Sequence, residues 1–124
     1  MKLNPREFDK VVRRAIRRVP NEIRDHLENI LISVKKRPPA DILDEMGLPR
    51  DYPLLGVYTG ASLMERSSSY PPLYPDTIFI FQEPLEEMCR TVEELEEQIE
   101  ITVVHEIAHY LGMTEDELYD LGYE

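Results

Sequence analysis

The chain has 124 residues, of which 42% are hydrophobic and 31% charged, a composition typical of one soluble globular domain. No apolar run approaches the roughly 18 residues that cross a membrane, so we expect no membrane partner. The first residues show no secretory signal, and a single cysteine cannot form an internal disulfide. We therefore expect a cytoplasmic protein with one domain over residues 1–124.

The net charge of −11 is unevenly distributed along the chain. Residues 1–50 carry 12 basic and 8 acidic side chains, a balance of +4, whereas residues 51–124 carry 2 and 17, a balance of −15. Because so acidic a protein is repelled by nucleic acid, we expect no nucleic-acid partner. A basic cluster is interpreted as a solvated helix face that attracts the acidic C-terminal half; it comprises Arg13, Arg14, Arg17 and Arg18.

The N-terminal third predicts a helix, a strand and a short helix. Apolar residues recur at helical spacing over residues 5–18, with Asn4 as the N-cap. The short, β-branched run 29–34 predicts a buried strand. Residues 40–47 predict one or two helical turns that end at a glycine.

The middle of the chain predicts strands and one long loop. Residues 54–58 and 62–66 read as a hairpin, and the proline-rich segment 67–76 as a loop. Residues 77–82 are the strongest strand pattern. If this strand forms an edge of the sheet, it could bind an extended peptide by strand addition.

The C-terminal part predicts three helices. The first covers residues 84–89, and its spacing makes Cys89 a buried hydrophobe rather than a catalytic thiol. A capping box opens a helix of about 20 residues over 91–111, which Gly112 ends. A second capping box starts a short helix over 114–121.

The long helix contains the pattern His-Glu-x-x-His. His105 and His109 lie about 40° apart on one face, close enough for two imidazoles to share a metal. Glu106 lies beside them, where a general base would face the open position of the metal. The opposite side is apolar and predicts burial; it carries Val103, Val104, Ile107 and Leu111.

A third ligand is expected after the helix ends. Glu115 follows His105 by ten residues, which extends the pattern to His-Glu-x-x-His-x-x-Gly-x-x-Glu. Metzincin proteases place a third histidine at this spacing, and a carboxylate also binds zinc. Asp116 is the alternative ligand. Both residues also suit the first turn of a capped helix, where acidic side chains are favoured without any metal.

This ligand set favours Zn²⁺, which lowers the pKa of a bound water to about 7. Glu106 would take a proton from that water and pass it to the leaving amine, so the predicted reaction is hydrolysis of a peptide bond. The oxyanion needs a further stabiliser besides the metal. The tyrosines that could provide it are Tyr70, Tyr74, Tyr110 and Tyr119, among which the sequence does not choose.

Several segments together resemble the zincin-like metallopeptidase type 1 family of small bacterial proteins. The resemblance is carried by Arg37–Pro39, Gly56–Gly60, Leu63–Arg66, Pro75–Phe81, Pro84–Leu85, Met88–Cys89 and, most specifically, Thr102–Met113. It implies an α+β minimal zincin with a metzincin-like fold, in which a small mixed β-sheet packs on an N-terminal helix and on a long active-site helix. It also implies that His105, His109 and an acidic residue just past Gly112 bind zinc.

Two functions follow from these patterns. The first is a zinc metalloprotease that acts on an unidentified peptide or protein. The second is a weak or inactive zincin-like domain that binds a protein or peptide. Glu106 favours the first, because a structural zinc site has four closed ligands and needs no adjacent base.

Overall fold

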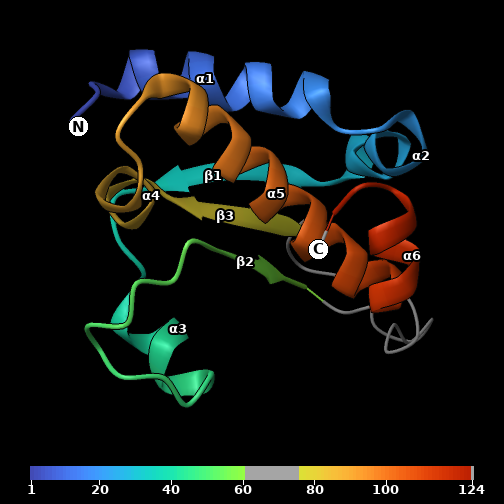
Figure 1. Ribbon diagram of the computed structural model, residues 1–124. Coiled ribbons are helices and arrows are strands. Elements are labelled where there is room, and N and C mark those ends of the chain that lie inside the picture. Colours follow the sequence, from blue (N-terminus) through green and yellow to red (C-terminus); the bar gives the residue numbers. More distant parts are fainter. Residues whose placement is uncertain (61–75, 124) are drawn as a thin grey trace.

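The computed structural model describes residues 1–60 and 76–123, which form a small α+β fold (Figure 1). In chain order the elements are α1 (Pro5–Arg18), α2 (Asn21–Arg24), the 3-10 turn η1 (Asp25–Asn29), β1 (Leu31–Lys35), α3 (Ala40–Glu45), β2 (Gly56–Thr59), β3 (Thr77–Phe81), α4 (Gln82–Met88), α5 (Val92–Leu111) and α6 (Glu115–Asp120). The predicted strand 62–66 and nearly all of the predicted loop 67–76 lie outside the described residues.

The described strands form one mixed sheet in the order β1-β3-β2. Strand β3 pairs in parallel with β1 and antiparallel with β2. The hypothesis that residues 77–82 form a sheet edge is therefore wrong. The side chains of β3 explain its central position. Ile78, Ile80 and Phe81 are fully buried, which requires cover on both faces of the strand.

Strand β1 differs from its prediction in one respect. A strand forms as expected, but Leu31 is 53% exposed and Val34 is 36% exposed, so it is not a buried strand. The reason is its position, because β1 is a terminal strand among the described strands, where it pairs only with β3. Its run of β-branched residues indicated a strand correctly but carried no information about strand order.

The core lies where the two long helices meet each other and the sheet. Helix α1 packs along α5, and α5 in turn contacts β2 and β3 (Figure 1). The predicted helical stripes supply the buried side chains: Phe8, Val11, Val12 and Ala15 from α1, and Leu95, Ile99, Val103 and Ile107 from α5. Cys89 is buried as predicted. No helix in the described part of the chain is long and apolar enough to span a membrane.

Most predicted helix ends are confirmed. Asn4 forms a full capping box with Glu7 at the start of α1, and Thr114 forms one with Glu117 at the start of α6. At the start of α5, Thr91 accepts the Glu94 N–H as predicted. The Glu94 carboxylate, however, accepts the backbone N–H of Arg90 instead of closing the box.

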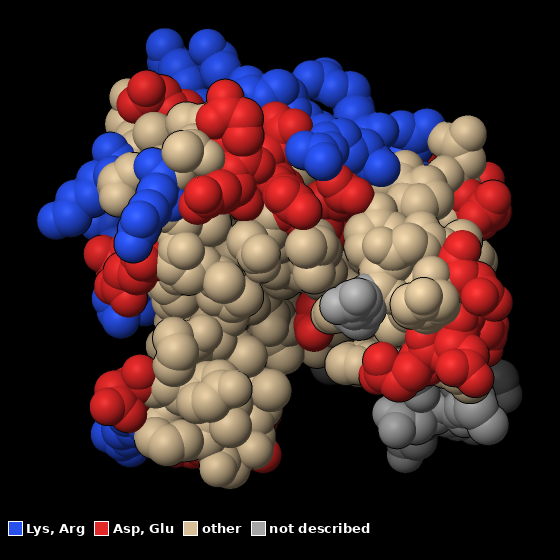
Figure 2. All heavy atoms as spheres, viewed as in Figure 1, with Lys and Arg blue, Asp and Glu red and all other residues tan. Residues whose placement is uncertain are grey.

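Ion pairs join α1 to the acidic half of α5, as the charge distribution predicted. Arg14 contacts Glu96 at 2.7 Å, and Arg18 contacts Glu96 at 3.0 Å and Glu100 at 2.9 Å. Figure 2 shows the result as a basic band over α1 beside acidic side chains over the N-terminal half of α5. The acidic face of α5 is thus partly neutralised within the molecule.

Strand β2 approaches α5 very closely at Gly56. A Cβ atom at this position would lie 2.7 Å from Cγ2 of Thr102 and 2.9 Å from the carbonyl oxygen of Phe79, both too close for a carbon atom. Two turns further along α5, the ring of Tyr110 stacks on that of Tyr58 with centroids 4.7 Å apart. Strand β2 is therefore held against α5 near both of its ends.

We expect the ion pairs of Glu96 to make folding stability depend on pH. Hydrogen bonds from Arg14 and then Arg18 lower the pKa of the Glu96 carboxyl below its ordinary 4.5. A carboxyl with a lowered pKa stabilises the fold above its ordinary pKa, and that contribution disappears as the pH falls through the folded pKa. Glu96→Gln should lower the free energy of unfolding by about 1 kcal/mol or less at pH 7 and by much less at pH 3.

Urea unfolding at both pH values measures this difference. Glu97→Gln is the matched control, because Glu97 lies on the same helix and forms no ion pair with a described residue. Equal losses in Glu96→Gln and Glu97→Gln at pH 7 would contradict the prediction.

We expect Gly56→Ala to destabilise the fold by about 1–3 kcal/mol, because the added methyl group overpacks the contact between β2 and α5. Thr102→Ser removes the methyl group at 2.7 Å but keeps a hydroxyl that can bond Gln98. The double variant should therefore recover part of the loss, as measured by thermal unfolding. A Gly56→Ala variant as stable as the wild type would show that β2 does not lie this close to α5.

Candidate metal centre

The residues of the predicted motif lie on the last two turns of α5. The helix runs without a break through His105, Glu106 and His109 and ends at Gly112, which adopts the left-handed conformation with φ 70°. The other side of these turns is fully buried: Val103, Val104, Ile107 and Ala108 show no exposed surface. Packing of this side fixes the rotation of the helix and hence the direction in which the motif residues point.

His105 presents a buried nitrogen without a hydrogen-bond partner. Its Nε2 atom is inaccessible to solvent and has no partner among the described residues. Such a nitrogen costs free energy unless something binds it, and a neutral imidazole nitrogen is the commonest ligand for zinc. His109, one turn further on, is exposed at the end of the helix. Both side chains are of a type that binds zinc, and their joint ligation of a metal stays a prediction.

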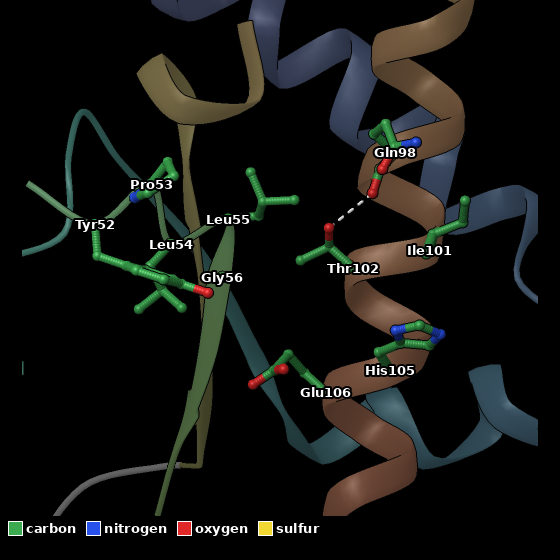
Figure 3. Close-up of a pocket in the computed structure, with 10 residues that line it drawn as sticks. All are labelled: Tyr52, Pro53, Leu54, Leu55, Gly56, Gln98, Ile101, Thr102, His105 and Glu106. Carbon is green, nitrogen blue, oxygen red and sulfur yellow. Dashed lines mark hydrogen bonds between the residues drawn. The ribbon is translucent and has the colours of Figure 1, made fainter. Parts of the chain in front are cut away.

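Glu106 points from α5 toward β2, while the imidazole of His105 lies on the neighbouring face of the helix (Figure 3). Its Oε1 atom accepts the backbone N–H of Tyr58 at 2.8 Å. Burial raises the pKa of the Glu106 carboxyl, and the Tyr58 N–H and the two histidines oppose this shift only in part. A carboxyl with a raised pKa accepts and holds a proton more readily than an exposed one.

The Tyr58 N–H lies on the side of β2 that faces away from β3. The bond from the Phe81 N–H to the Leu55 carbonyl places Leu55 in a hydrogen-bonded pair with β3. Because these pairs alternate along an antiparallel ladder, the backbone groups of Gly56 and Tyr58 point away from β3. Glu106 therefore contacts β2 on the side opposite to β3.

A cavity of about 310 Å³ adjoins this contact. It lies between α5 and the segment that leads into β2, and Figure 3 shows its lining: Tyr52, Pro53, Leu54, Leu55, Gly56, Gln98, Ile101, Thr102, His105 and Glu106. The cavity thus opens beside the first histidine and the predicted base.

The predicted third ligand lies on α6, after the helix that carries the histidines. Glu115 is exposed at the first position of α6, where its charge suits the helix N-terminus, and Asp116 follows it. Within residues 1–60 and 76–123, no three His, Cys, Asp or Glu side chains are arranged to hold a metal ion. Ligation by Glu115, or by Asp116, therefore stays a prediction.

The four candidate tyrosines are placed differently. Tyr110 stacks on Tyr58, and Tyr119 is 70% exposed on α6. Tyr70 and Tyr74 lie outside the described residues. The structure does not select an oxyanion stabiliser from this set.

The contributions of β2 and the cavity were not predicted from the sequence. No sequence motif marks the Tyr58 backbone or the lining residue Leu55, because their roles depend only on where the fold places them. One signal was present: a glycine at a strand position, here Gly56, often marks close approach of another backbone or element.

Comparisons with known proteins identify the family of this chain. The sequence model of a family described as Zincin-like metallopeptidase matches residues 27–123. No curated protein matches the chain. A solved structure of a conserved hypothetical protein from Thermo thermophilus shares 19% sequence identity and a TM-score of 0.53, covering 88% of this chain and 94% of that chain. At this identity the likeness shows the fold alone. Because the family match spans most of the sequence, this chain belongs to the zincin-like metallopeptidase family.

Proposed function

We propose that this protein is a zinc-dependent peptidase in which His105 and His109 hold the metal, Glu115 completes the ligand set and Glu106 is the general base. The family supports this class of chemistry. The observation that carries the proposal is the juxtaposition on α5 of a buried, unpartnered His105 Nε2 and a desolvated Glu106 carboxyl.

Zn²⁺ bound by these residues would supply an activated water and a polarised carbonyl. The protein supplies the proton transfer. The Tyr58 N–H holds Oε1 of Glu106, which fixes the carboxyl against β2 and leaves Oε2 for the reacting groups. Glu106 takes a proton from the attacking water and delivers it to the amine nitrogen that leaves.

The position of β2 at one end of the described sheet supports a peptide as the substrate. An extended chain can pair with outward-pointing backbone groups of a terminal strand, and those of Gly56 lie beside the cavity. This assigns to β2 the role that the sequence analysis had considered for residues 77–82. Pairing at Gly56 would place the peptide backbone beside the cavity.

We expect the purified protein to bind one zinc ion per chain. His105→Ala and His109→Ala should lose it, because each removes a nitrogen ligand, whereas His26→Ala should retain it as the matched histidine control. Elemental analysis of protein equilibrated with zinc measures the stoichiometry. Loss of zinc in Glu115→Ala but not in Asp116→Ala would identify Glu115 as the third ligand. The reverse result would identify Asp116. A wild-type protein that binds no zinc would refute the metal site.

We expect Glu106→Gln to lower peptide hydrolysis by roughly 10²–10⁴-fold while zinc binding is kept, because only the proton acceptor is lost. Cleavage of a mixed peptide library, read by mass spectrometry, measures the effect. Glu97→Gln, an exposed glutamate on the same helix, is the control and should cleave normally. A zinc-loaded wild-type protein that binds library peptides but cleaves none would instead establish the binding domain considered above.

A further inference from the structure

We propose that Tyr123 is a positioning residue for the proposed metal centre. Its hydroxyl, bound to Glu100, holds α6 against α5 and so keeps Glu115 within reach of the two motif histidines. This inference rests on the proposed function and adds a residue, outside the motif, on which the third ligand depends. Three observations carry it: the buried contact of Tyr123, the attachment of α6 at both of its ends and the face of α6 on which Glu115 lies.

Tyr123 is a buried residue in the segment that follows α6. It is only 8% exposed and belongs to the hydrophobic core. Its hydroxyl donates to Oε2 of Glu100 on α5 at 2.5 Å. Burial, and then the hydrogen bond to Glu100, raise the pKa of the Tyr123 hydroxyl, so it remains a proton donor at neutral pH. A buried hydroxyl that loses its partner costs free energy, and this contact therefore fixes where the segment lies.

The acceptor, Glu100, is itself held from a second direction. Its Oε1 atom is inaccessible to solvent and lies 2.9 Å from Nε of Arg18 on α1. Because α1 packs along α5, this ion pair restrains the carboxylate that Tyr123 contacts. The side chain of Glu100 thus joins three parts of the fold: α1, α5 and the segment after α6.

Helix α6 is attached to α5 at both of its ends. Before α6 begins, the N–H of Met113 donates to the Ala108 carbonyl in the turn that follows α5. After α6 ends, the chain returns to α5 (Figure 1), where Tyr123 contacts Glu100 roughly 12 Å before Ala108 along the helix axis. His105 lies between these two points of attachment. Helix α6 therefore runs back alongside the turns of α5 that carry the motif.

Helical geometry places Glu115 next to the buried face of α6. The buried residue of this helix is Leu118, which is 4% exposed. Since successive residues are 100° apart, Glu115 lies about 60° from Leu118 around the helix axis, whereas Asp116 lies about 160° from it. Glu115 thus borders the side of α6 that packs on the core, and Asp116 lies on the outward side. Docking of α6 through Tyr123 therefore acts mainly on Glu115.

The first test is the zinc affinity of Tyr123→Phe, measured by competition with a chromophoric chelator under conditions in which every variant is folded. Phenylalanine keeps the buried ring but removes the hydroxyl, so the affinity should fall at least about fivefold as Glu115 becomes less well held. Tyr119→Phe makes the same change at a 70% exposed position of α6 and should bind zinc as the wild type does. An unchanged affinity in Tyr123→Phe would overturn the proposal.

A second control separates positioning from general stability. Val12→Ala removes buried methyl groups from α1, so it should lower the free energy of unfolding but leave the zinc affinity of the folded protein unchanged. A loss of zinc affinity in Val12→Ala equal to that in Tyr123→Phe would show that any destabilisation has this effect, and would overturn the positioning role.

A double-mutant cycle tests whether Tyr123 acts through Glu115. Because Glu115→Ala already removes the ligand, adding Tyr123→Phe should lower the zinc affinity by no more than about twofold further. The visible absorption of the Co²⁺-loaded Tyr123→Phe variant should also shift toward that of Glu115→Ala. A full fivefold effect of Tyr123→Phe in the Glu115→Ala background would overturn the positioning of Glu115.

Amide hydrogen exchange of the metal-free protein tests the docking of α6 itself. The N–H of Leu118 donates to the Thr114 carbonyl, and that of Tyr123 donates to the Leu118 carbonyl. In Tyr123→Phe the exchange of these two amides should accelerate at least about fivefold more than that of Val12 in α1, because α6 loosens locally. Equal acceleration at Leu118 and Val12, or none at Leu118, would contradict the docking role.

The outcomes separate this proposal from the proposed function. A wild-type protein that binds zinc with the same affinity as Tyr123→Phe would overturn the positioning role and keep the metal site. An effect of Tyr123 on zinc affinity that depends on Glu115, without any peptide cleavage, would keep the positioning role and overturn the peptidase. A wild-type protein that binds no zinc would overturn both.

Discussion

The contact between Gly56 and Thr102 is the constraint on which the candidate centre depends. The absence of a side chain at Gly56 lets β2 lie directly against α5, with the methyl group of Thr102 in the space that a Cβ would occupy. Only at this separation can a strand N–H reach a carboxylate on the helix, as Tyr58 reaches Glu106 at 2.8 Å. A packing detail between two apolar groups thereby sets the position of the predicted base.

Helix α5 combines three surfaces that serve different purposes. Its fully buried stripe anchors it to α1 and β3, its glutamates pair with the arginines of α1, and its remaining face carries the motif and one wall of the cavity. These roles do not compete, because residues three or four positions apart share a face while their neighbours point elsewhere. The length of the helix matters as well, since pairing with α1 and the candidate centre lie at opposite ends of it.

Local features of the sequence were sufficient to predict the helices. The bounds of α1 follow from its apolar period and capping box, and the C-terminal limit of α5 follows from Gly112. The order of the strands was not predictable from such patterns, because β1 and β3 both contain β-branched residues, yet among the described strands one is terminal and the other central. Only pairing partners distant in sequence distinguish them.

The candidate site likewise combines residues whose placement the sequence predicts with contacts that it does not predict. His105, Glu106 and His109 share one helix, so their relative placement follows from helical geometry alone. The cavity and the Tyr58 contact join residues about 50 positions apart, and no local pattern encodes such a meeting. Glu115 shows most clearly why the sequence alone does not decide a ligand. Its spacing from His105 suits a metal ligand, but an acidic residue is also favoured at a helix N-terminus when no metal is bound.

Strand β1 is terminal among the described strands, which has a consequence for the behaviour of the protein in solution. An apolar terminal strand can pair with the same strand of another molecule, which leads to aggregation. Here the strand ends at Lys35, whose ammonium lies over the ring of Phe79, and Lys36, Arg37 and two prolines follow at once. Positive charge and proline oppose the approach of a like strand, so β1 carries its own protection against self-association at the edge remote from the candidate centre.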